Sequence, residues 1–115
     1  MKLVKISTLF TILLITYFSL KTPDGHDLPT NDKVGHFLAY TILSIHLLLL
    51  SKTKRGNLLA FLFSIFYGLL MEFFQGFVPG REQSFYDFIA NSLGTLIGLG
   101  IILLFKQNIL TLLAK

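Results

Sequence analysis

The sequence predicts an all-α integral membrane protein, a bundle of four transmembrane helices with both chain ends in the cytoplasm (N-in/C-in). The chain has 115 residues, of which 53% are hydrophobic and 14% are charged. Its mean hydropathy is +0.70, and it holds too little polar sequence to cover a water-soluble core of this size. Lipid is therefore the expected solvent. The chain has no cysteine, which excludes disulfides and thiolate metal sites.

Four apolar segments approach the length of about 20 residues that a spanning helix needs. They lie at about 4–20, 34–50, 58–78 and 85–105. A polar loop at 21–33, a basic turn at 51–57 and a Pro79-Gly80 turn join them. None of these connections is long enough to form a second domain, so residues 1–115 are predicted to be a single transmembrane domain.

The first segment is open to another interpretation. Lys2 and Lys5 precede its apolar stretch, as the basic residues of a secretory signal peptide do. No small-x-small cleavage site follows the stretch, and this favours a membrane span.

The placement of the basic residues predicts the orientation, because Lys and Arg are retained on the cytoplasmic side. With the N-terminus inside, seven of the ten basic residues are cytoplasmic, and only Lys21, Lys33 and Arg81 lie outside. All six acidic residues then fall in or near the outer half. The basic residues sit mostly in short turns and tails flanking apolar runs, which argues against nucleic acid as a partner.

Polar and ionisable residues gather near the outer ends of three segments. The second carries Asp32, Lys33, His36 and Tyr40, the third Glu72 and Gln75, and the fourth Asp87 and Asn91. Within each segment the spacing of three or four places most of them on one helix face. At 1.5 Å per residue they lie within roughly 10–12 Å of the outer boundary. An ionisable group in a span costs about 2.5–3.5 kcal/mol on insertion scales, so their shared depth predicts one outward-opening polar pocket.

The residue types predict roles within this pocket. Glu72, His36 and Asp87 are the candidate catalytic residues, because histidine and buried carboxyl groups are the side chains that most often carry out acid-base chemistry. Lys33 and Arg81 are candidates for holding phosphate or carboxylate groups, with Arg81 in the turn above the pocket. The other predicted binding residues are Asp32, Tyr40, Gln75 and Asn91.

Structural explanations compete for several of these residues. Asp32 fits an N-cap, and Ser84-x-x-Asp87 resembles a capping box with Asp in place of the usual Glu or Gln. Lys33 and Arg81 could instead snorkel to lipid headgroups. Tyr40 is also explained as a packing aromatic, and Gln75 and Asn91 as hydrogen-bonding glue between helices.

No such explanation applies to Glu72, whereas His46 is predicted to have a structural role only. Glu72 lies between apolar runs well inside its segment, where no cap explains it. His46 lies deeper and about 80° round the helix from His36, so it is predicted to be structural. The Gly94-x-x-x-Gly98 pair predicts close helix packing.

Three blocks of the sequence together resemble the VanZ-like membrane proteins. They are Asp32-Lys33-x-x-His36-Phe37-x-x-Tyr40, then Glu72-x-x-Gln75 leading to Pro79-Gly80-Arg81, then Asp87-x-x-x-Asn91-x-x-Gly94. They occur in the family's order and cover residues 32–94. The resemblance implies a bacterial cell-envelope protein of the cytoplasmic (inner) membrane. It also implies a link to teicoplanin resistance, with which the founding member is associated.

Two classes of function fit the same residues. The first is an enzyme that acts on an envelope lipid or a lipid-linked cell-wall precursor at the outer leaflet. The second is a non-catalytic binder of an anionic headgroup or glycopeptide, or an accessory subunit of a cell-wall synthesis enzyme. The enzyme is slightly preferred, because His36 and Glu72 share one depth. A transporter is less favoured, since the inner halves of the segments are apolar and no continuous polar path is visible.

The cofactor is left open by the sequence. A divalent cation held by His36, Glu72 and Asp87 is an alternative, but it is not favoured because their spacing matches no metal motif. The expected partners are membrane lipids and a lipid-linked precursor or glycopeptide. The sequence predicts no oligomeric state.

Overall fold

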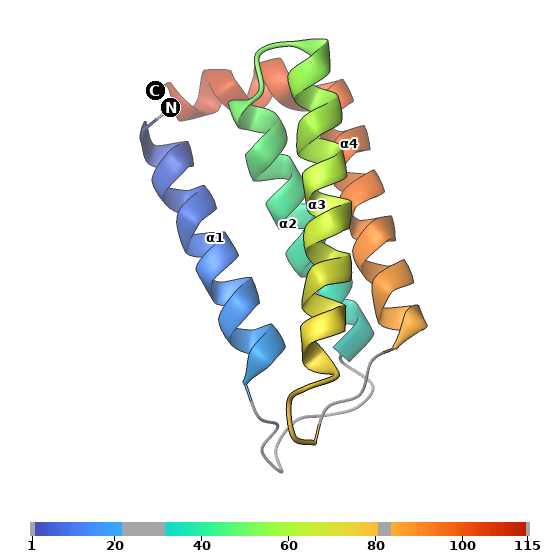
Figure 1. The fold of residues 1–115 in the computed structure, drawn as a ribbon. Helices are drawn as coiled ribbons and strands as arrows, with labels where there is room; N and C mark the ends of the chain where they lie inside the picture. Colours follow the sequence, from blue (N-terminus) through green and yellow to red (C-terminus); the bar gives the residue numbers. More distant parts are fainter. Residues whose placement is uncertain (1, 22–31, 81–83, 115) are drawn as a thin grey trace.

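A computed structural model describes residues 2–21, 32–80 and 84–114 of this chain. These residues form four α-helices and no strand: α1 (Lys2–Leu20), α2 (Asp32–Leu50), α3 (Lys54–Gln75) and α4 (Phe85–Leu113) (Figure 1). All four helices are long and apolar enough to cross a membrane. The prediction of an all-helical, multi-pass membrane protein is confirmed.

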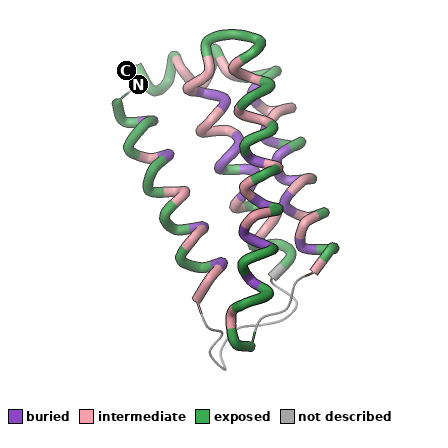
Figure 2. The backbone as a smooth tube through the Cα atoms, viewed as in Figure 1, coloured by how far each residue is buried: buried purple, intermediate pink, exposed green. Residues whose placement is uncertain are grey.

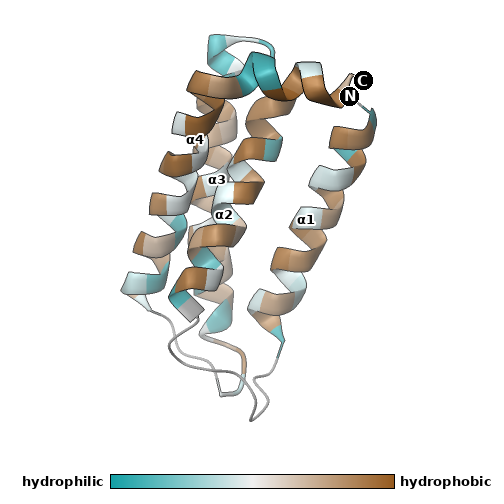
Figure 3. Cartoon of the chain, turned by 180° about the vertical axis from the view of Figure 1, so that it is seen from behind, coloured by the Kyte–Doolittle hydropathy of each residue, from teal (hydrophilic) through white to brown (hydrophobic). Residues whose placement is uncertain are grey.

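The side chains are arranged as lipid requires, with apolar groups outside and small polar groups between the helices. Large hydrophobic side chains are exposed on every helix, among them Leu3, Phe10, Val34, Phe66 and Leu104. Most of α1 is exposed (Figure 2), and hydrophilic residues gather mainly at the two ends of the bundle (Figure 3). Ser44, Ser64 and Thr95 are fully buried. Such small polar residues let membrane helices approach closely. The interior therefore holds a larger share of polar residues than the surface does.

Two helix boundaries of α3 differ from the predicted 58–78 for local reasons. The helix begins at Lys54, because the Thr53 side chain accepts a hydrogen bond from the Gly56 N–H at 2.9 Å and caps it. It ends at Gln75, where the Gly76 N–H donates to the carbonyl groups of Phe73 and Phe74. The basic turn predicted at 51–57 is correspondingly shorter.

Helix α4 extends beyond the predicted 85–105, to Leu113. Its last part crosses the end of the bundle towards the start of α1 (Figure 1). Lys106 lies within this helix, and its side chain contacts the end of α2. Its Nζ donates to the carbonyl oxygens of Leu48 at 2.9 Å and Ser51 at 2.5 Å, and a cation at the C-terminal end of a helix is favourable.

The most extensive helix contact joins α2 and α4. A Cβ atom added at Gly94 would lie 2.3 Å from the carbonyl oxygen of Phe37, and one at Gly98 would lie 2.9 Å from that of Thr41. Only glycine permits backbones to come this close. The predicted role of this glycine pair in close helix packing is confirmed.

Side-chain hydrogen bonds join helix α1 to the bundle at two places among the described residues. The Ser7 hydroxyl lies 2.7 Å from His46 Nε2, and the Thr16 and Tyr67 hydroxyls bond to each other. His46 Nδ1 also donates to the carbonyl oxygen of Ile42 at 2.8 Å. Both ring nitrogens of His46 therefore have partners, Nε2 on α1 and Nδ1 in the preceding turn of α2, away from the polar residues at the other end of α2.

The arrangement of the helices places both chain ends and the turn between α2 and α3 at the same end of the bundle (Figure 1). That this end faces the cytoplasm is a prediction from the basic residues. Single cysteines introduced at Gly25 and at Ser51 in this cysteine-free chain should differ in labelling by an impermeant thiol reagent. In intact cells we expect Gly25→Cys to be labelled and Ser51→Cys to be protected.

Permeabilised cells provide the control for that experiment, because both cysteines should then react equally. Preferential labelling of Ser51→Cys in intact cells would reverse the orientation.

Candidate functional site

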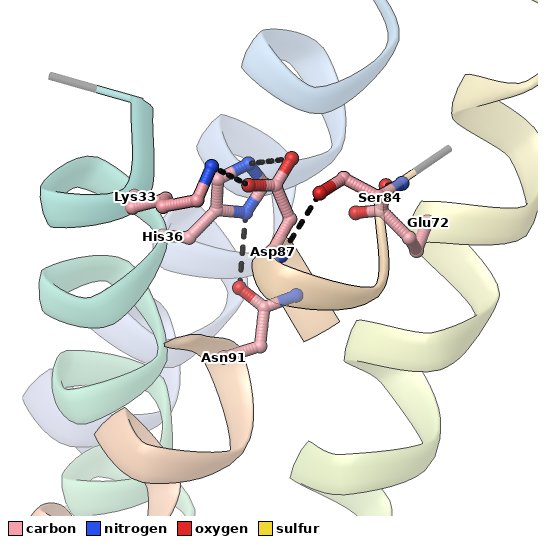
Figure 4. A network of polar contacts seen from close by, with 6 residues as sticks. All are labelled: Lys33, His36, Glu72, Ser84, Asp87 and Asn91. Atoms are coloured by element: carbon pink, nitrogen blue, oxygen red, sulfur yellow. Dashed lines mark hydrogen bonds and ion pairs between the residues drawn. The ribbon is translucent and has the colours of Figure 1, made fainter. Parts of the chain in front are cut away.

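Six residues from three helices form a polar cluster at the end of the bundle where α2 and α4 begin and α3 ends. They are Lys33, His36, Glu72, Ser84, Asp87 and Asn91 (Figure 4). We call this group the polar cluster. The sequence predicted that three segments would bring polar groups to one depth, and the cluster contains five of the nine predicted site residues.

Asp87 lies at the centre of the polar cluster and is almost fully buried. Its Oδ1 lies 3.4 Å from Lys33 Nζ, and its Oδ2 lies 3.8 Å from His36 Nε2. The Lys33 side chain is 57% exposed, whereas that of Asp87 is 6% exposed. The ammonium group thus stands at the edge of the cluster and the carboxylate inside it.

The ring of His36 is held by the side-chain amide of Asn91. His36 Nδ1 lies 2.9 Å from Asn91 Oδ1, and because a carbonyl oxygen only accepts, Nδ1 is the donor. In the neutral ring this assigns the proton to Nδ1 and leaves the lone pair on Nε2. That lone pair lies on the nitrogen that approaches Asp87, where it can accept a proton or bind a cation.

Glu72 contacts the start of α4. Its Oε1 accepts a hydrogen bond of 2.6 Å from the backbone N–H of Ser84, the N-cap residue of α4. Glu72 is 6% exposed. The sequence offered no explanation for a carboxylate at this depth. The hydrogen bond from Ser84 provides part of that explanation.

The predicted capping box at Ser84-x-x-Asp87 is present in one direction. The Ser84 hydroxyl accepts from the Asp87 N–H at 3.4 Å, as an N-cap does. In a full capping box the third residue returns a hydrogen bond to the N-cap N–H, but Glu72 from α3 accepts that hydrogen bond instead. The Asp87 carboxylate faces Lys33 and His36, which makes Asp87 part of both the cap and the cluster.

Three potential metal ligands meet in the cluster. His36, Glu72 and Asp87 each offer one ligand atom, and these atoms all lie within 4.8 Å of one another. Glu72 and Asp87 are buried and His36 is partly buried. The geometry therefore supports cation binding better than the sequence spacing suggested.

The other predicted site residues lie around or outside the cluster. Gln75 is 2% exposed, one turn after Glu72, and its Nε2 has no hydrogen-bond partner among the residues that the structure describes. Tyr40 packs in an apolar core with Ile15 and Leu43. Asp32 begins α2, and its side chain lies outside the described part of the chain, as does the whole of Arg81.

Sequence reasoning missed Ser84 as a member of the site. Its side chain signalled an N-cap, but its contact with Glu72 uses the backbone N–H, which no side-chain pattern reveals. The positioning role of Asn91 was also missed, although Asn91 was among the predicted binding residues.

A cavity of about 550 Å³ lies at the opposite end of the bundle. Its walls come from the start of α1, the end of α2 and the last part of α4, and include Leu3, Leu49, Lys52, Lys106 and Leu110. This is not the place at which the sequence predicts an outward-opening pocket, which stays a prediction.

Comparison with known proteins identifies relatives of this chain. The family model described as VanZ/LLP1 matches residues 2–106. An uncharacterized protein of the fission yeast Schizosaccharomyces pombe is 30% identical over 107 residues, which cover 90% of this chain and 66% of the relative. The chain thus spans slightly less than two thirds of that relative. No solved structure matches this sequence.

Proposed function

The chain belongs to the VanZ/LLP1 family, as its motifs predicted, and we propose that it acts on the headgroup of an envelope lipid or lipid-linked cell-wall precursor. The observation that carries this proposal is the buried carboxylate of Asp87 beside Nε2 of His36, with the exposed Lys33 at the edge. This arrangement places a side chain that can bind an anion, Lys33, next to side chains that can transfer a proton, His36 and Asp87. We place it at the outer leaflet of a bacterial cytoplasmic membrane.

Four residues of the polar cluster support parts of this proposed function. The ammonium group of Lys33 is exposed enough to attract a phosphate group of a lipid. In its neutral form the His36 ring can accept a proton at Nε2, and the nearby carboxylate of Asp87 stabilises the charged ring that results. Glu72 supplies a second titratable group at the same level. General acid-base catalysis of this kind typically contributes about 10²–10⁴-fold to a rate.

The relatives bear on the choice of substrate. The link to teicoplanin resistance that the VanZ-like resemblance implies favours a lipid-linked cell-wall precursor as the substrate. A relative in fission yeast favours a chemical group that bacterial and fungal membranes share, and a phosphate-bearing headgroup meets both conditions. We therefore propose the phosphate-bearing headgroup as the part of the substrate that the cluster contacts.

The experiment is to incubate the purified full-length chain with labelled phospholipids and lipid-linked precursors and to analyse the products by mass spectrometry. We expect the wild-type protein to form a product. Lys33→Ala should raise KM about fivefold with little change in kcat, because a surface charge that binds the substrate is worth about 1 kcal/mol. Lys52→Ala is the matched control, since Lys52 lies at the opposite end of the bundle.

A non-catalytic binder is the second candidate, and one observation favours it. Asp87 is approached by Lys33, His36 by Asn91, and Glu72 by Ser84, so the cluster is already organised and can recognise an anion without a reaction. Stoichiometric binding of a labelled lipid with no product, weakened by Lys33→Ala and unchanged by Glu72→Gln, would replace the enzyme with this binder. Such a protein could capture a headgroup or glycopeptide, or serve a cell-wall synthesis enzyme.

A further inference from the structure

We infer that His36, Glu72 and Asp87 form a binding site for one divalent cation. The three side chains come from α2, α3 and α4, and each places one ligand atom within 4.8 Å of the other two. The site lies in the cluster on which the proposed function rests, but cation binding can be measured without any lipid substrate.

The separation of the ligand atoms suits a single ion. Two ligands on opposite sides of a cation are about 4.2 Å apart for bonds of about 2.1 Å, and about 4.8 Å apart for bonds of about 2.4 Å. The ligand atoms of the three residues lie within 4.8 Å of one another, which is within the larger of these separations and exceeds the smaller by at most about 0.6 Å. Small side-chain movements are sufficient to place one ion between them.

The tautomer of His36 suits a ligand. A histidine that binds a metal usually donates its other ring N–H to an oxygen atom, which orients the ring. His36 Nδ1 donates to Asn91 Oδ1, so Nε2 presents its lone pair on the side of Asp87. Asn91 is 2% exposed, so the partner that orients the ring is itself buried.

Both carboxylates are held in place in a similar way. Glu72 Oε1 accepts the Ser84 N–H, and Asp87 Oδ1 faces Lys33 while Oδ2 faces His36. Two buried carboxylates in one apolar bundle repel each other, and a divalent cation between them would reduce that repulsion.

A buried amide group provides an independent indication of a ligand. Asn91 Nδ2 has no hydrogen-bond partner within the described residues, and Asn91 is 2% exposed. Figure 4 shows the amide nitrogen of Asn91 on the side of the cluster where Glu72 lies. An unsatisfied buried donor costs about 1–3 kcal/mol. A water or phosphate oxygen that completes the coordination of a cation would accept this N–H group.

The ligand set indicates the kind of ion. One imidazole nitrogen with two carboxylate oxygens suits Mn²⁺ or Zn²⁺. Three protein ligands leave further positions for water or a phosphate oxygen, which fits the headgroup proposed above. While the ion is bound, His36 Nε2 is a ligand and does not accept a proton. The sequence did not favour a metal because the ligands come from three separate helices rather than from one motif.

The test uses the full-length chain in nanodiscs after treatment with a chelator, and Mn²⁺ alone as the probe. Electron paramagnetic resonance measures free Mn²⁺, and we expect one ion bound per chain and its displacement by Zn²⁺. His36→Gln, Glu72→Gln and Asp87→Asn should each weaken binding at least tenfold. His46→Gln is the matched control, because both nitrogens of His46 bond elsewhere in the bundle.

A second measurement does not depend on the folding of any variant. In the wild-type protein, spin-echo spectra of bound Mn²⁺ should show modulation from one imidazole nitrogen. Mn²⁺ and Zn²⁺ binding no greater than in empty nanodiscs, or the absence of this modulation, would overturn the site. Equal binding by the wild-type protein and all three variants would overturn it as well. Cation binding without lipid turnover would retain the site and remove the proposed enzyme, and turnover without cation binding would do the reverse.

Discussion

Replacement of Glu72 by Gln is expected to lower turnover of the lipid substrate by about 10²–10⁴-fold, the range of general acid-base catalysis, while the bundle remains folded. Gln has the shape of Glu and keeps an oxygen that accepts the Ser84 N–H. The substitution therefore removes the charge and spares the contact with α4. Product formation measured by mass spectrometry gives the rate, and circular dichroism during unfolding in SDS gives the stability.

Two further substitutions complete this experiment. Glu82→Gln makes the same chemical change in the connection between α3 and α4 and should leave turnover intact. Glu72→Ala removes the acceptor as well as the charge, so we expect an additional loss of stability of about 1–3 kcal/mol from the unsatisfied Ser84 N–H. Full activity of Glu72→Gln would mean that Glu72 serves only to hold the start of α4.

Replacement of Gly94 by Ala is expected to destabilise the bundle by about 3 kcal/mol or more, at the upper end of the usual cost of overpacking. The added methyl group would lie 2.3 Å from the carbonyl oxygen of Phe37 and 3.1 Å from the backbone nitrogen of Thr41. Backbone atoms cannot rotate away as a flexible side chain can, so α2 and α4 must separate. Unfolding in SDS, followed by circular dichroism, measures the change.

Gly100→Ala is the matched control for this substitution. It lies on the same helix, and nothing stands within 4 Å of the position that its Cβ would occupy. We expect no loss of stability, because Ala favours a helix over Gly by about 1 kcal/mol. Equal stability of the two variants would show that the α2–α4 contact is looser than described here.

The fold was predictable because four long apolar segments allow few arrangements in a bilayer. The depth of His36, Glu72 and Asp87 was predictable for the same reason, since a helix rises by a constant amount per residue. The spacing of Gly94 and Gly98 indicated a close helix contact, and the structure identifies α2 as the partner.

The individual contacts could not be predicted, because they depend on how the helices are rotated against one another. Nothing in the sequence pairs Glu72 with the backbone of Ser84, or Asn91 with His36. Lys106 illustrates a different difficulty. The apolar run that predicted the fourth helix ends at Phe105, but the helix continues to Leu113 and Lys106 caps α2 from within α4.

The close contact between α2 and α4 has a consequence for biosynthesis. A ribosome makes the chain from its N-terminus, so α2 and α3 enter the bilayer before α4 exists. Until then, His36 has neither Asn91 nor Asp87 beside it, and Glu72 has no Ser84 N–H to accept. The site is therefore complete only once α4 is in place.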